Sequence, residues 1–192
     1  MVVLELSYDD MPAARSTLKA LTTRYCFWWW LPFALVACTG VILIRARFVD
    51  VLPASTASAF LGSAMLGLVA GLVGHELIHI LAYDWQGIRA YLMPVRRSLS
   101  ELHTLATTTR GDYSGRSAAV ALLAPFAVGV VIAALTLPSA VVGRRPVSVF
   151  LFVFALACFG GAGSDVTQAL FCLASPTRRV YEDEHVRRFY DQ

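Results

Sequence analysis

The chain has 192 residues, of which 57% are hydrophobic and only 15% are charged, and its formal net charge is +3. Soluble domains usually carry about 25% charged residues, so this composition argues against an ordinary soluble protein. A dense basic run interleaved with aromatic residues is absent from the sequence, which argues against nucleic-acid binding. The four cysteines show no CxxC spacing, and we interpret them as residues of apolar segments.

Residues 1–25 form a polar stretch that we expect to be a short cytoplasmic arm, with a small strand at VVLEL. Four apolar blocks follow: Cys26–Ile44, Phe60–Tyr83, Ser117–Val142 and Val147–Ala174. Almost all charged residues lie outside these blocks. Each block reaches the roughly 18 to 20 residues that a helix needs to cross a bilayer. The sequence therefore predicts an all-α membrane protein with about four transmembrane helices, embedded in the lipid bilayer.

The connections between these blocks complete the predicted organisation. The longest connection, residues 85–116, contains WQGIRAYLMPVRRSLS, which we expect to form a hairpin or a membrane-associated loop. TTTRGDYSGR then resembles a polar linker. GGAGSD interrupts the fourth block, and residues 175–192 are expected to be a polar cytoplasmic tail. We therefore predict an arm at 1–25, a transmembrane domain at 26–174 and a tail at 175–192.

The distribution of lysine and arginine predicts the orientation of the helices. Twelve of these 16 residues lie in the arm, the second connection and the tail, and four lie in the other two connections. Positively charged residues concentrate on the cytoplasmic side of a membrane. A multi-pass integral membrane protein with both termini in the cytoplasm is the expected topology.

The second apolar block contains three ionisable residues in the sequence GHELIHILAY. His75 and His79 are four residues apart, so on a helix they lie on one face, one turn from each other. With Glu76 they make the HExxH pattern of zinc peptidases, in which two histidines bind the metal and the glutamate acts as general base. Ionisable residues inside a membrane cost about 2.5–3.5 kcal/mol each, and a divalent cation compensates this cost. The alternative is that the three side chains hydrogen-bond to neighbouring helices.

A catalytic zinc ion usually has three protein ligands and one position for water. Asp165 is the acidic residue of the fourth block, and no other block except that of HExxH contains an acid. Counted from the cytoplasmic ends of their helices, Asp165 and the HExxH motif lie at a similar depth. Asp165 is therefore the predicted third ligand, and a helix-packing contact with Ser164 or Gln168 is the alternative.

These motifs resemble those of a known protein group. GHELIHILAY, a later helix with LLAPF and then GAGSDV are similar to the site-2 protease type of intramembrane zinc metalloprotease, and most similar to its small zincin-peptidase branch. The resemblance covers about residues 60–180. It implies a zinc site of His75, His79 and Asp165 with Glu76 as the catalytic base. The chain departs from larger members, which carry Asn-Pro and Asp-Gly near the third ligand, because Gly163 to Val166 stand there instead.

The function expected from these residues is hydrolysis of a peptide bond in a membrane-anchored protein substrate, near the cytoplasmic face. One alternative is a metal-binding membrane protein without proteolytic activity, such as a transporter or sensor, although the first and third blocks lack the charged residues of a transport path. A scaffold descended from a protease is a further alternative, and the intact Glu76 argues against it. The sequence indicates neither the substrate nor the oligomeric state.

Overall fold

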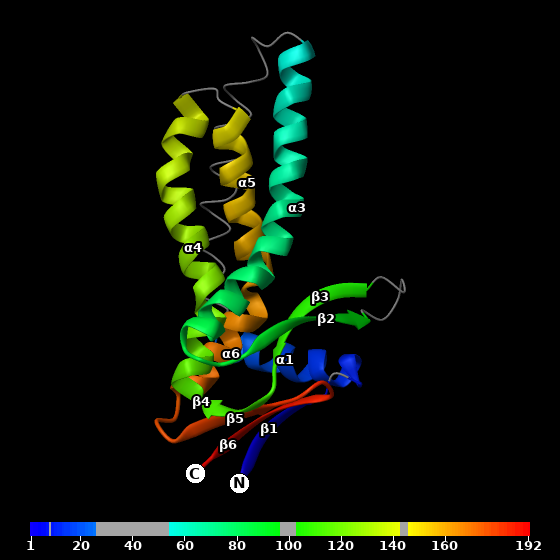
Figure 1. The fold of residues 1–192 in the computed structure, drawn as a ribbon, viewed down its shortest axis with the longest axis vertical. Coiled ribbons are helices and arrows are strands. Elements are labelled where there is room, and N and C mark those ends of the chain that lie inside the picture. Colours follow the sequence, from blue (N-terminus) through cyan, green and yellow to red (C-terminus); the bar gives the residue numbers. More distant parts are fainter. Residues whose placement is uncertain (8, 26–53, 97–102, 143–145) are drawn as a thin grey trace. The chain divides into compact units, whose positions relative to one another are not determined.

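The computed structural model describes residues 1–7, 9–25, 54–96, 103–142 and 146–192 (Figure 1). The chain divides into two compact units, and two of the boundaries between them fall inside continuous helices, Ala54–Trp85 and Gly115–Val142. Unit 1 comprises residues 1–27, 76–125 and 162–192, and unit 2 comprises residues 28–75 and 126–161.

Two long helices of the described residues meet the requirements for crossing a membrane by length and composition. They are α3 (Ala54–Trp85) and α4 (Gly115–Val142), with candidate spans at Ser58–Trp85 and Gly115–Ser139. A third span results if α5 (Pro146–Gly161) and α6 (Gly163–Leu173) are counted as one interrupted helix. The chain thus has the features of a membrane protein. The predicted span Cys26–Ile44 lies outside the described residues, so the count of four remains a prediction.

Local sequence signals explain where these helices end. The Ser114 hydroxyl accepts a hydrogen bond from the backbone N–H of Ser117 and so caps the start of α4. After α3, Gly87 has a φ of +75°. The N–H of Gly87 bonds to Asp84 O and that of Ile88 bonds to Tyr83 O, which is the Schellman arrangement that glycine permits. This turn directs the chain from the end of α3 into the following hairpin.

Unit 2 contains the first part of α3, most of α4 and the whole of α5. Small residues on α3 allow the backbone of α5 to approach closely: a Cβ built on Gly67 would lie 2.5 Å from Phe150 O, and one on Gly71 would lie 2.5 Å from the Cβ of Ala157. Such small-residue contacts are typical of helix pairs in membranes. Large apolar side chains on the same part of α3 are exposed, among them Leu61, Met65, Leu66, Val69 and Leu72, as expected for a lipid-facing surface.

Unit 1 contains two antiparallel β-sheets, so the prediction of an all-α fold is wrong. The larger sheet has the order β1-β6-β5-β4. Its strands are β1 (Val2–Ser7), β4 (Gly111–Ser114), β5 (Arg178–Glu182) and β6 (Val186–Asp191). The expected strand at VVLEL is confirmed. The tail, expected to be merely polar, supplies two of the four strands and pairs with the arm through the register Glu5 to Arg188, and both chain ends lie at this sheet (Figure 1).

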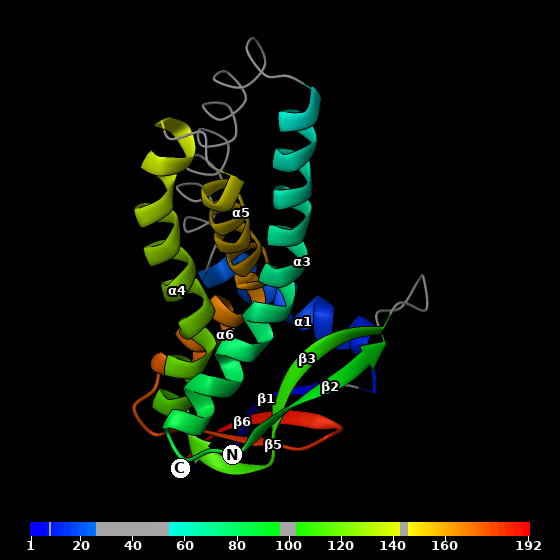
Figure 2. The ribbon, with the colours of Figure 1, turned by 45° about the horizontal axis from the view of Figure 1, so that its top comes forward.

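The second sheet is the hairpin of β2 (Ala90–Arg96) and β3 (His103–Thr109), in which Thr107 pairs with Leu92. Figure 2 shows the two strands side by side along their length. The connection thus contains a hairpin, but only its first strand lies within WQGIRAYLMPVRRSLS, for which the sequence predicts a hairpin or a membrane-associated loop. The TTT segment, expected to be a linker, belongs to β3 instead.

The core of unit 1 joins these strands to the helices. Tyr83 at the end of α3 makes an edge-to-face contact with Tyr113 of β4, and Phe171 of α6 makes one with Phe189 of β6. Helix α1 (Met11–Tyr25) packs against α6 and β1. Because α1 and Phe189 of β6 both contact α6, the residues of its first turn have a defined position.

Candidate metal centre

The HExxH motif lies in the half of α3 that the predicted topology places toward the cytoplasm. Both of its histidines are buried. His75 and His79 are each only 4% exposed. The boundary between the two units falls between His75 and Glu76, but α3 is continuous there, so the helix itself sets the place of His75 one turn before His79. The two imidazoles therefore share one helix face, as the spacing predicts.

Asp165 meets these histidines from the first turn of α6. The Oδ2 atom of Asp165 lies 3.3 Å from Nε2 of His79. One donor atom from each of His75, His79 and Asp165 can be chosen so that all three lie within 4.8 Å of one another. The prediction that these residues come together is confirmed, and the group can hold a metal ion.

Hydrogen bonds on the far side of each ring determine which nitrogen is available. His75 Nδ1 lies 3.0 Å from Cys158 O, and His79 Nδ1 lies 2.9 Å from Ala121 O. A carbonyl oxygen can only accept, so each Nδ1 carries the hydrogen, and in the neutral ring the lone pair is then on Nε2. Backbone carbonyls orient metal-binding histidines in this way in many proteins.

The contact between His79 and Asp165 requires a proton or a metal ion between the two acceptor atoms. With Nδ1 protonated, a neutral His79 directs the Nε2 lone pair toward a carboxylate oxygen, and two acceptors at 3.3 Å repel each other. A second proton on His79, a proton on Asp165 or a metal ion removes this repulsion. The proton would serve one histidine, whereas a metal ion would use the donor atoms of all three side chains.

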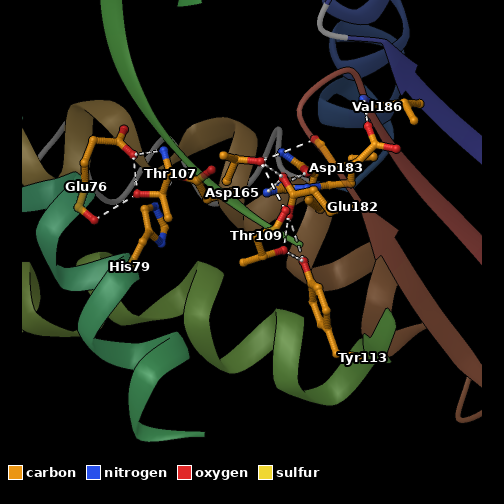
Figure 3. Close-up of polar contacts among 12 residues, drawn as sticks. Glu76, His79, Thr107, Thr109, Tyr113, Asp165, Glu182, Asp183 and Val186 are labelled. Carbon is orange, nitrogen blue, oxygen red and sulfur yellow. Dashed lines mark hydrogen bonds and ion pairs between the residues drawn. The ribbon is translucent and has the colours of Figure 1, made fainter. Parts of the chain in front are cut away.

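Glu76 points to the β2–β3 hairpin, as the close-up shows (Figure 3). Its Oε2 atom accepts hydrogen bonds from the backbone N–H of Thr107 at 2.8 Å and from the Thr107 hydroxyl at 2.9 Å. The same hydroxyl lies 2.9 Å from Glu76 O. The glutamate of the motif is thus held by a strand that lies 31 residues further along the chain.

A buried polar cluster adjoins these residues in unit 1 (Figure 3). Glu182, which is 0% exposed, accepts hydrogen bonds from Thr109 Oγ1 at 2.7 Å and from Tyr113 OH at 2.9 Å. Arg187 donates to Glu182 Oε1 at 2.6 Å and to Gln168 Oε1 at 2.7 Å. Gln168 lies one turn after Asp165 on α6, so the cluster fixes the helix that carries the carboxylate of the candidate site.

Sequence reasoning missed Thr107 and this cluster. Gln168 was considered as a contact of Asp165, but its side-chain oxygen accepts from Arg187. Glu182 and Arg187 belong to the segment 175–192, which the sequence predicts to be a polar tail. Val and Tyr in RRVYE, and Val, Phe and Tyr in VRRFY, are residue types enriched in strands, and these two short runs are the signal for two strands there.

Comparison of the chain with protein-family models, curated proteins and solved structures gives no match. The resemblance to site-2 proteases therefore remains a prediction that depends on the HExxH motif, on Asp165 and on their order along the chain.

Proposed function

We propose that the chain is an intramembrane zinc metalloendopeptidase that hydrolyses a peptide bond of a membrane-anchored protein. The observation that carries this proposal is the meeting of His75, His79 and Asp165 within 4.8 Å, next to the glutamate of an HExxH motif in a long apolar helix. A structural polar contact needs neither the third donor nor this glutamate. The arrangement is what a hydrolytic metal site requires.

The donor set suits zinc. Zinc bonds of about 2.0–2.1 Å to nitrogen and 2.0–2.2 Å to oxygen place two ligands of a tetrahedral ion about 3.4 Å apart. The Nε2 of His79 and Oδ2 of Asp165 are 3.3 Å apart. Two neutral imidazoles and one carboxylate also form a ligand set found in catalytic zinc enzymes. His75, His79 and Asp165 are therefore the proposed ligands.

In the proposed reaction, the bound zinc supplies Lewis-acid activation of the attacking water and the scissile carbonyl. Glu76 takes a proton from that water as the water oxygen forms a bond to the carbonyl carbon. When the C–N bond breaks, Glu76 passes the proton to the leaving amine. The backbone carbonyls of Cys158 and Ala121 keep the two imidazoles oriented throughout.

The membrane setting constrains the substrate. A transmembrane helix bonds its amides internally, so it must unwind before a carbonyl can react. Among the described residues the smaller sheet consists of β2 and β3, and such a hairpin has strand edges with which an unwound segment can pair. Since 12 of the 16 lysines and arginines lie on one predicted side, we propose that cleavage takes place near the cytoplasmic face.

The central test is Glu76→Gln in the full chain, purified in detergent. Cleavage of fluorescein-labelled casein, an unfolded probe that needs no helix unwinding, should fall by at least about a hundredfold, as for loss of a general base. Zinc content, measured by mass spectrometry, should stay near one per chain. Glu184→Gln is the matched control, because Glu184 is exposed and pairs with Arg110. Full proteolysis by Glu76→Gln would refute the assignment, and wild-type protein that binds zinc without cleaving would favour a metal carrier or sensor.

Asp165→Ala tests the third ligand separately. Loss of one of three ligands should reduce the zinc content well below one per chain after dialysis, because each ligand contributes to affinity. Asp183→Ala, which changes an acid in the turn after β5, is the control. Unchanged zinc in Asp165→Ala would mean that another residue completes the site.

A further inference from the structure

The contact between Thr107 and Glu76 joins the β2–β3 hairpin to the helix that carries the HExxH motif. The amide of Thr107 donates to Glu76 Oε2 at 2.8 Å, and its hydroxyl hydrogen lies between Oε2 and the backbone carbonyl oxygen of Glu76, each 2.9 Å from Oγ1. Charge-assisted hydrogen bonds of this kind are roughly twice as strong as neutral ones. The pair therefore restricts the torsions of a side chain that is otherwise flexible.

The direction of the Thr107 amide shows which edge of the hairpin faces α3. In an antiparallel ladder, amides point alternately toward the partner strand and away from it. Thr107 is aligned with Leu92 of β2, but its amide donates to Glu76. The outer edge of β3 is thus turned toward the motif helix at this residue.

The strand that holds Glu76 is itself anchored. The two residues after Thr107 are buried, and Thr108 and Thr109 both donate to Glu182. Glu182 in turn pairs with Arg187. A donor on such a fixed strand keeps its position, whereas a donor on a mobile loop would not. This is the arrangement by which outer residues fix a functional side chain.

We propose that Thr107 is a positioning residue that holds Glu76 in the orientation for proton transfer. This inference rests on the proposed function. The simpler reading is that Glu76 merely satisfies an edge amide of β3 and that the hydroxyl only stabilises the fold. The two readings differ in what the loss of the hydroxyl changes: turnover in the first, stability or metal content in the second.

The test compares Thr107→Val, which has nearly the same shape without the hydroxyl, with Thr107→Ser, which keeps it. With labelled casein as probe, Thr107→Val should lower kcat about tenfold or more, from the loss of a hydrogen bond to a charged group. KM, zinc content and melting temperature should stay near wild type, and Thr107→Ser should recover kcat to within about threefold. Thr17→Val is the matched control, since Thr17 donates its hydroxyl within α1.

Three results would overturn the proposal while leaving the protease assignment intact. One is an active wild type with an unchanged kcat in Thr107→Val. Another is a parallel loss of zinc or thermal stability, and the third is no recovery by Thr107→Ser. Failure of the wild type to cleave would instead refute the proposed function.

A readout without activity tests the contact itself. Glu76→Ala should speed hydrogen exchange of the Thr107 amide relative to wild type, because its acceptor is removed. Unchanged exchange would show that the contact does not hold Glu76.

Discussion

Removing one partner from the buried pair of Glu182 and Arg187 should destabilise the protein far more than removing one partner from an equally short pair on the surface. Their atoms approach to 2.6 Å, and both side chains are at most 8% exposed. Glu182→Gln removes the negative charge beside the buried Arg187, whose guanidinium also donates to Gln168. Breaking a buried pair by removing one partner costs about 3–5 kcal/mol.

For a chain of this size, each kcal/mol lowers the melting temperature by about 2–4 °C. Glu182→Gln should therefore melt about 6–20 °C below wild type in the same detergent, measured by intrinsic tryptophan fluorescence. Glu5→Gln is the matched control: Glu5 and Arg188 also lie on neighbouring strands, 2.7 Å apart, but are 48% and 43% exposed. That control should stay within about 2 °C of wild type.

A double variant separates the ion pair from the packing around it. Glu182→Met combined with Arg187→Met removes both charges, so it should cost less than the sum of the two single changes. Equal losses for the buried and the exposed pair, or strict additivity in the double variant, would refute the reasoning that burial makes this pair strong.

Two further outcomes follow from other contacts. The Arg178 side chain lowers the pKa of Asp191, and the backbone N–H of His185 lowers the pKa of Asp183, both below the usual 3.8. The stability that these contacts provide is therefore complete above about pH 4. It is lost as the pH falls through the lower pKa values of the folded state. Melting curves from about pH 6 to 2.5 should fall less steeply for Asp183→Asn with Asp191→Asn than for wild type, and identical slopes would contradict the assignment. Gly71→Ala should lower the melting temperature, because its new Cβ would lie 2.5 Å from the Cβ of Ala157. Gly62→Ala is the control and should not lower the melting temperature, because its new Cβ would meet nothing within 4 Å. Equal effects would mean that α3 and α5 do not pack closely.

The parts of the site that the sequence predicts are those with a local signature. The four-residue spacing of His75 and His79 fixes their common face on any helix, and an acid in an apolar block is costly enough to identify Asp165 as functional. The interruption between α5 and α6 at residue 162 likewise follows from GGAGSD.

The parts that it does not predict depend on contacts between distant residues. Pairing of Glu5 with Arg188 joins strands 183 residues apart, and no local pattern specifies such a partner. Thr107 stands in a polar run typical of a linker, and its role depends on a strand register. Glu182 and Arg187 resemble exposed charges because composition carries no information about which charges become buried.

The pairing of β1 with β6 has a consequence for biosynthesis. The first strand leaves the ribosome long before residues 186–191 are translated, and its neighbour in the sheet, β6, is the last element of the described chain. The nascent protein can thus insert its apolar helices before the sheet is complete. A stalled or truncated product would contain HExxH without the strands that hold its surroundings, and should be a ready target for quality-control degradation.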